Sequence, residues 1–119
     1  MATFSKSILS GSTDGKQIKV AATATAGTLI HTGSTTPATL HEVWLYAVNT
    51  DSTDRKLTIE WGGVASPDDL IEYTVKAENG LYLIIPGLII KGNATALNVR
   101  AFAATAHVIC ISGYVNVIA

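Results

Sequence analysis

The sequence predicts an all-β protein, a single-domain β-sandwich with a jelly-roll-like arrangement of about eight or nine short antiparallel strands. Three observations support this prediction. The chain has 119 residues, the size of one domain with one hydrophobic core. From Leu40 onward, apolar residues recur with a period near two and form short runs between turn residues. Apolar residues at helical spacing are hard to find. An immunoglobulin-like strand order fits the same pattern.

The N-terminal third is less regular than the rest of the chain. Residues 1–39 form a segment rich in small residues, in which we expect one or two strands, and residues 40–119 form the sandwich core of the same domain. The stretch Ala21–Gly27 consists of Ala, Thr and Gly alone. We interpret it as an extended connection that packs along the domain. The alternative is an arm that exchanges with a neighbouring subunit.

Two segments alternate polar and apolar residues, which is typical of strands with one face in the core and one in water. In Lys56–Trp61, the polar residues Lys56, Thr58 and Glu60 should face the solvent. The segment Ile71–Lys76 alternates in the same way. We therefore expect two strands that each have a solvated face.

Turn residues divide the region that follows. The pair Asn79–Gly80 supplies the positive φ angles of a type I′ turn, which predicts a tight hairpin between the preceding strand and Leu81–Ile85. Pro86–Gly87 should then end this strand, and Leu88–Ile90 should form another.

The segment Val43–Val48 is apolar or aromatic at every position. As a strand, it would direct Val43, Leu45 and Ala47 to one face. Trp44, Tyr46 and Val48 would point to the other face. One face would meet an opposing sheet about 10 Å away. The other face needs cover from a long loop or from another subunit.

The chain is also poor in charge. Charged residues make up 14% of it, whereas soluble domains contain about 25%. Depletion of charge is a feature of the buried core of subunit contacts. We therefore predict a homo-oligomer, in which Val43, Trp44, Leu45 and Tyr46 are the candidate contact residues.

Net charge and hydropathy argue against two classes of partner. Eight Lys and Arg residues are balanced by nine Asp and Glu residues, so the chain lacks the basic excess that binds nucleic acid. The longest apolar run, Leu81–Ile90, is interrupted by Pro86–Gly87 and is about half as long as a membrane-spanning helix. We expect neither nucleic acid nor a membrane as a partner.

Motifs of catalytic, cofactor-binding or metal-binding chemistry are missing. His31, His41 and His107 are far apart in the sequence, and none lies near another His or Cys at metal-ligand spacing. The loop Asn49–Asp54 is rich in oxygen ligands but lacks the Gly and the distant Glu of a calcium-binding hand, so a polar turn is the simpler interpretation. No Gly-x-Ser-x-Gly nucleophile motif is present. We expect no enzymatic activity, no cofactor and no metal.

The aromatic residues allow one rival function. If Trp44, Trp61 and Tyr82 shared an exposed face, they could stack on sugar rings, and the chain would be a carbohydrate-binding module. The two Trp residues lie within apolar strands, however, and aromatic side chains contribute strongly to cores. The core interpretation is therefore favoured for them.

A resemblance to a known family extends over most of the chain. A start rich in Ser, Thr and Gly precedes the blocks His41–Asn49 and Lys56–Gly63, and a strand-rich ending follows. This order resembles that of the capsid decoration, or cement, proteins of tailed bacteriophages.

The resemblance implies a β-sandwich that assembles as a homotrimer on the outside of the capsid. There it would bind the major capsid protein and stabilise contacts between neighbouring major-capsid subunits, with Val43, Trp44, Leu45 and Tyr46 as candidate contacts. The protein would be made in the host cytoplasm and end in the virion, on the capsid surface. No catalytic residues carry over. In the rival function, the sugar-binding module would belong to a phage tail or fibre.

Overall fold

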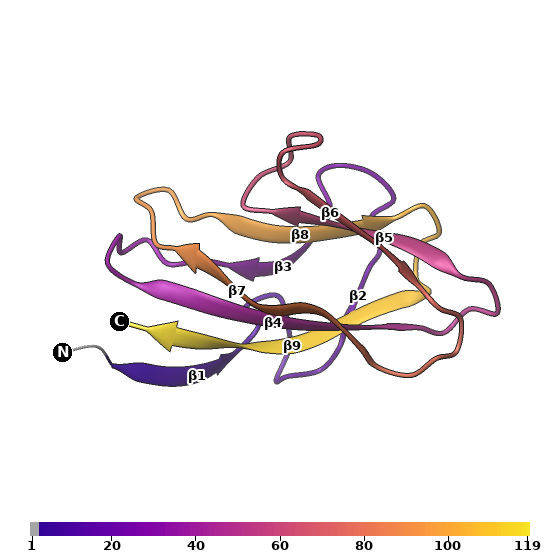
Figure 1. Cartoon of the computed structure of the whole chain (residues 1–119), viewed down its shortest axis with the longest axis horizontal. Coiled ribbons are helices and arrows are strands. Elements are labelled where there is room, and N and C mark those ends of the chain that lie inside the picture. Colours follow the sequence, from indigo (N-terminus) through magenta and orange to yellow (C-terminus); the bar gives the residue numbers. More distant parts are fainter. Residues whose placement is uncertain (1–2) are drawn as a thin grey trace.

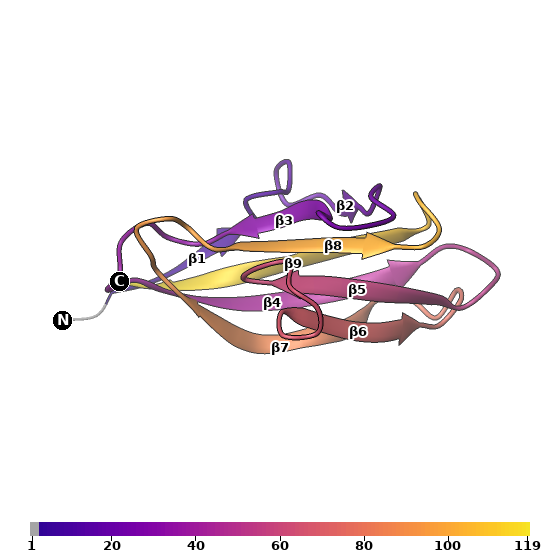
Figure 2. The same cartoon turned by 90° about the horizontal axis from the view of Figure 1, so that it is seen from above.

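A computed structural model describes residues 3–119 as two antiparallel β-sheets stacked face to face (Figures 1 and 2). This part of the chain contains no helix that is long and apolar enough to cross a membrane. The strands are β1 (Phe4–Ile8), β2 (Ile18–Lys19), β3 (Thr28–Thr32), β4 (Leu40–Asn49), β5 (Arg55–Trp61), β6 (Leu70–Val75), β7 (Tyr82–Lys91), β8 (Asn98–Ala103) and β9 (Ile109–Ile118).

The strand order is that of a jelly roll. One sheet, here called sheet A, has the order β1-β9-β4-β7, and the short β2 also pairs with β9; the other, sheet B, has the order β3-β8-β5-β6. Apart from β2, the strands form nested antiparallel pairs, in which the first strand pairs with the last and the middle two pair with each other: β1·β9, β3·β8, β4·β7 and β5·β6. Successive pairs alternate between the two sheets. A long hairpin rolled in this way is the jelly-roll topology. The predicted all-β, jelly-roll-like sandwich is confirmed.

The core lies between the sheets and follows the period-two pattern of the strands. Val43, Leu45 and Ala47 of β4 point into it and have no exposed surface, and Leu57 and Ile59 of β5 face them from sheet B. Full burial of a Leu or Ile side chain stabilises the fold by about 1.5–3 kcal/mol. The alternate residues of β4 are half-buried on the outer face of sheet A, so the prediction of a strand that is apolar on both faces is confirmed.

The outer face of β5 differs from the prediction. Lys56 is exposed, but Thr58 and Glu60 are fully buried, so the expected solvated face is wrong at these two positions. The cause is distant in the sequence. The connection between β2 and β3 runs over sheet B, where the hydroxyl of Thr25 and the backbone N–H of Gly27 donate hydrogen bonds to the Glu60 carboxylate. In β6, by contrast, Glu72 and its neighbours alternate as predicted.

The predicted hairpin at Asn79–Gly80 is wrong. The strands on either side of this pair, β6 and β7, lie in different sheets, so the segment between them crosses the edge of the sandwich (Figure 2). Positive φ angles do occur here, at Glu78 and Gly80. A hydrogen bond from the Glu78 N–H to the Asn49 carbonyl ties the crossing to the end of β4. The turn residues therefore indicated a change of direction but not strand pairing.

Pro86–Gly87 does not end a strand either, because β7 continues from Tyr82 to Lys91. The ladder with β4 shifts register at this point, as in a β-bulge. An edge strand tolerates Pro, since one side of its backbone has no partner strand. Gly87 has a φ of 76°, and a Cβ there would lie 2.8 Å from Cζ2 of Trp44. Glycine thus leaves room for the indole ring.

The described part of residues 1–39 contributes three strands, one or two more than expected. β1 and β2 pair with β9 in sheet A, and β3 pairs with β8 in sheet B. The stretch Ala21–Gly27 packs along the domain, since Ala21 and Ala22 bind Thr28 and Gly27 binds Glu60. An exchange of this stretch between subunits stays a prediction.

Candidate functional site

The outer face of sheet A brings together side chains from β1, β4 and β9. On β4, Glu42, Trp44 and Tyr46 alternate with the core residues and point away from the core. The register of β9 places Asn116 beside Glu42 and Tyr114 beside Trp44. Because side chains directly opposite one another on adjacent strands are in contact range, this face carries a continuous band of aromatic and polar groups.

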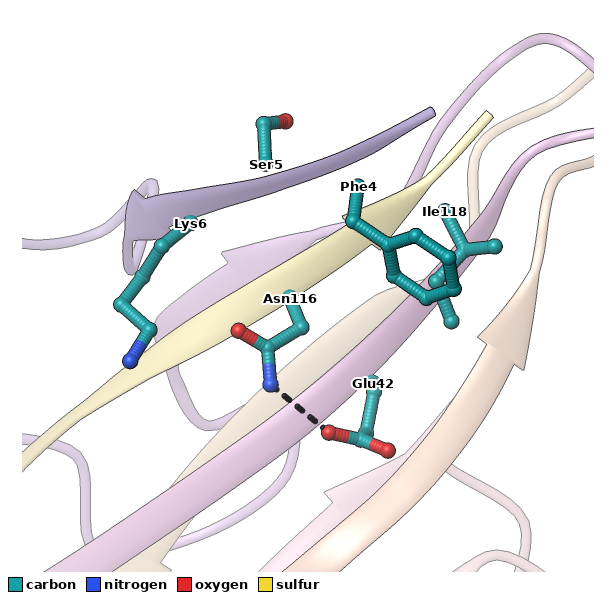
Figure 3. Close-up of a pocket in the computed structure, with 6 residues that line it drawn as sticks. All are labelled: Phe4, Ser5, Lys6, Glu42, Asn116 and Ile118. Atoms are coloured by element: carbon teal, nitrogen blue, oxygen red, sulfur yellow. Dashed lines mark hydrogen bonds between the residues drawn. The ribbon is translucent and has the colours of Figure 1, made fainter. Parts of the chain in front are cut away.

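A hollow of about 290 Å³ opens on this face, where the edge strand β1 lies along β9 (Figure 3). Phe4 and Ile118 face each other in the register and form its apolar end. Two residues further along β1, Lys6 faces Asn116, which in turn faces Glu42 of β4. The hollow therefore has an apolar end and a polar end.

Glu42 is held in one orientation by two donors. The indole Nε1–H of Trp44 and the amide Nδ2–H of Asn116 both donate to Oε1 of Glu42, each over 2.8 Å. Both bonds favour the ionised form and so lower the pKa of the Glu42 carboxyl below its ordinary value. The bond from Trp44 has the larger effect, followed by that from Asn116. At neutral pH the site presents a fixed carboxylate.

The aromatic part of the band is equally ordered. The rings of Trp44 and Tyr114 stack with centroids 6.0 Å apart and planes 12° from parallel. The Nζ of Lys6 lies 4.6 Å from the centroid of the Tyr114 ring, a cation–π distance. Contacts therefore run without interruption from Lys6 through the two rings to Glu42, across β1, β9 and β4.

The structure separates the four predicted contact residues into two pairs. Val43 and Leu45 have no exposed surface and belong to the core, so their side chains cannot reach a partner. Trp44 and Tyr46 are half-buried on the outer face of sheet A. Only these two can take part in an intermolecular contact.

The three aromatic residues of the rival sugar-binding function do not share a face. Trp44 lies on the outer face of sheet A, whereas Trp61 ends β5 in sheet B and packs against the core. Tyr82 lies at the start of β7 and stacks on Tyr73, with ring centroids 5.2 Å apart. The aromatic neighbour of Trp44 is instead Tyr114, and the sequence did not show this contact because the pairing of β4 with β9 joins distant segments.

Two of the three histidines meet, contrary to the expectation from their separation in the sequence. His31 Nε2 lies 2.8 Å from His41 Nδ1, and the Ser10 backbone N–H donates to His31 Nδ1 over 3.1 Å. Burial, and secondarily the neighbouring His41, lower the pKa of His31 to about 4. Burial also lowers the pKa of His41. Within residues 3–119, no group of three or more His, Cys, Asp or Glu side chains is arranged to hold a metal ion.

Side-chain oxygen atoms of the loop Asn49–Asp54 accept hydrogen bonds from other groups of the same chain. The Asp51 carboxylate accepts a hydrogen bond of 2.7 Å from Arg55 Nε, which lowers the pKa of Asp51. The Asp54 carboxylate accepts the Ala77 N–H over 2.8 Å. These bonds fit the interpretation of the loop as a polar turn.

Comparison of the chain with protein-family models, with curated proteins and with solved structures found no match.

Proposed function

We propose that the chain is a structural virion protein of a tailed bacteriophage, which binds the outside of the capsid and stabilises contacts between major-capsid subunits. The resemblance of its sequence blocks to capsid decoration proteins suggests this function. The fold is compatible with it, because jelly rolls are common in viral capsid proteins. Since a fold does not determine a function, the proposal depends on where the apolar surface lies.

The exposed large apolar and aromatic side chains gather at the two edges of sheet A. Within residues 3–119, two of them lie on β1 and five on or beside β7, and only Val64 lies elsewhere. An exposed apolar edge strand offers unpaired backbone groups together with apolar side chains, a combination that monomeric proteins avoid. This distribution is the observation that carries the proposal. The seven residues are Phe4, Ile8, Leu81, Tyr82, Leu83, Leu88 and Ile89.

Attachment to a capsid would use these edges many times over. A repeated lattice lets several weak contacts act together, which raises the overall affinity without any single strong contact. A protein that binds the assembled lattice and not its separated subunits shifts the equilibrium toward the lattice. The sparse charge of the chain is compatible with a surface that is covered in this way.

The experiment mixes the purified protein with shells assembled from the major capsid protein of the same phage. We expect the protein to sediment with the shells and to raise the temperature at which they dissociate. Serum albumin added to a parallel sample controls for nonspecific protection. If the chain stays in the supernatant and the dissociation temperature does not change, the proposed function is wrong.

The proposal includes a homotrimer, in which the edges of sheet A contact copies of the chain or the capsid. Sedimentation equilibrium should then give about three times the chain mass of 12.4 kDa. A mass equal to one chain at micromolar concentration would contradict the trimer. It would leave attachment of single chains to the capsid as a separate proposal, which the shell experiment tests.

A further inference from the structure

We propose that the hollow on the outer face of sheet A binds a single pyranose ring of a neutral sugar. The hollow is lined by Phe4, Ser5, Lys6, Glu42, Asn116 and Ile118 (Figure 3). This proposal concerns the free chain: Phe4 belongs to the exposed edge strand β1, so a sugar and a protein partner at that edge would compete for it. The hollow is also distinct from the predicted trio of aromatic residues, none of which lines it.

The polar end of the hollow keeps hydrogen-bonding groups free. Oε1 of Glu42 accepts both intramolecular bonds, and no donor in residues 3–119 binds Oε2. In the same part of the chain, Oδ1 of Asn116 accepts no hydrogen bond, and Nζ of Lys6 forms no hydrogen bond or ion pair. A ligand therefore meets two free acceptors, with Glu42 already oriented by Trp44 and Asn116, while the Lys6 ammonium lies further along β1, over the Tyr114 ring.

The apolar end supplies a stacking surface. Phe4 is 71% exposed, although it pairs with Ile118 in the register of β1 and β9. Figure 3 shows the ring beside Ile118, while the Ser5 side chain points away from the hollow. A pyranose has an apolar face of C–H groups, which can lie on Phe4 while its hydroxyls reach the polar end.

Charge favours a neutral sugar over a simple anion or cation, and size favours a single ring. Lys6 and Glu42 carry opposite charges. The carboxylate therefore repels an anion, and the ammonium repels a cation. A hydroxyl group both donates and accepts hydrogen bonds, so it can bind to each of the free groups. A hollow of about 290 Å³ is at the small end of ligand sites and suits one ring rather than a chain of them.

The experiment titrates the full ¹⁵N-labelled chain with methyl glycosides of glucose, galactose, mannose and N-acetylglucosamine. We expect at least one of them to shift the Trp44 indole and Asn116 amide signals in a saturable way, with a dissociation constant of about 1–10 mM. The indole signal of Trp61, which lies in the other sheet, should not move. If none of the four sugars shifts the Trp44 and Asn116 signals, the proposal is wrong.

Three variants locate the site. Phe4→Ala removes the stacking ring and should weaken binding about tenfold. Glu42→Gln replaces a free acceptor by a donor and should weaken binding by a similar factor. Leu81→Ala, which shortens an exposed apolar residue beside the opposite edge strand, is the matched control and should bind as the wild type does. Because Phe4 is so exposed, Phe4→Ala should fold, and unchanged sugar binding by this variant would overturn the proposal even if Glu42→Gln did not fold.

Discussion

The imidazole rings of His31 and His41 share a hydrogen bond, with His31 Nε2 2.8 Å from His41 Nδ1. The Ser10 N–H donates to His31 Nδ1, so a neutral His31 must carry its proton on Nε2 and donate it to His41. This chain of bonds joins β3 of sheet B, β4 of sheet A and the loop after β1. A second proton on His31 would have to enter at Nδ1, where the Ser10 N–H already points.

The first prediction is a loss of stability in mild acid. His31 is 3% exposed and its pKa is about 4 in the folded chain, against 6.5 when unfolded. The unfolded chain therefore binds the proton more readily, and the stability from neutral His31 is complete above pH 6.5 and is lost as the pH falls toward 4. The loss amounts to about 3 kcal/mol. Urea unfolding at a series of pH values measures it.

The control for this prediction is a matched pair of variants. His31→Asn keeps a side-chain acceptor for the Ser10 N–H but cannot be protonated, so it should flatten the pH dependence between 6.5 and 4. His107→Asn changes an exposed residue with a φ of 68°, a conformation that Asn tolerates, and should retain the wild-type dependence. Equal pH dependence in the two variants would show that His31 is not responsible.

The second prediction concerns the fit between Gly87 and Trp44. Gly87→Ala introduces both a strained φ of 76° and a Cβ that lies 2.8 Å from the indole ring. Gly80→Ala meets the same strain, with a φ of 74°, but nothing lies within 4 Å of its Cβ. Each should lose about 1 kcal/mol through strain, and Gly87→Ala about 1–2 kcal/mol more through the steric contact. Chemical denaturation compares them, and equal losses would exclude a steric role for Trp44.

The third prediction tests the cover over sheet B. Glu60 is fully buried and accepts hydrogen bonds from Thr25 and from the Gly27 N–H. Glu60→Ala leaves the Gly27 donor without its partner and should destabilise the fold by about 2–3 kcal/mol. On the neighbouring strand, Glu72→Ala removes only an exposed ion pair with Lys56 and should cost about 0–1 kcal/mol. If both variants unfold at the wild-type denaturant concentration, the connection does not stabilise sheet B.

The fourth prediction tests the edge strand β7 as an attachment surface. Ile89 and Val64 are each 48% exposed, but only Ile89 lies on β7. Ile89→Lys places a charge among the apolar residues of that edge and should weaken binding to shells about tenfold. Val64→Lys adds the same charge to a loop and should bind as the wild type does. Cosedimentation with shells measures both, and equal binding would remove β7 from the interface.

Local sequence patterns predicted where the strands lie better than they predicted which strands pair. The alternation in β4 and β6 follows from the period-two geometry of a single strand, so Val43 and Glu72 lie on the faces predicted for them. The turn signal at Asn79–Gly80 is also local, and it could not show that the next strand joins the other sheet. Glu60 illustrates the same limit, since its cover comes from Gly27, 33 residues earlier.

The hollow on sheet A could not be predicted for a similar reason. Its residues come from β1, β4 and β9, and they meet only because β9 pairs with β1 on one side and with β4 on the other. Phe4 and Ile118 lie at opposite ends of the chain, and no local pattern links them. The same non-local pairing places Tyr114 beside Trp44 and brings His31 to His41. The sequence therefore predicted the apolar outer face but not its binding groups.

The most direct test of the central claim is an electron cryomicroscopy reconstruction of shells mixed with the protein. We predict additional density on the outer surface, where neighbouring major-capsid subunits meet, that accommodates a sandwich of 48 × 27 × 21 Å with an edge of sheet A toward the shell. Shells reconstructed without the protein provide the reference. Identical maps from the two samples would contradict the claim that the chain is a capsid decoration protein.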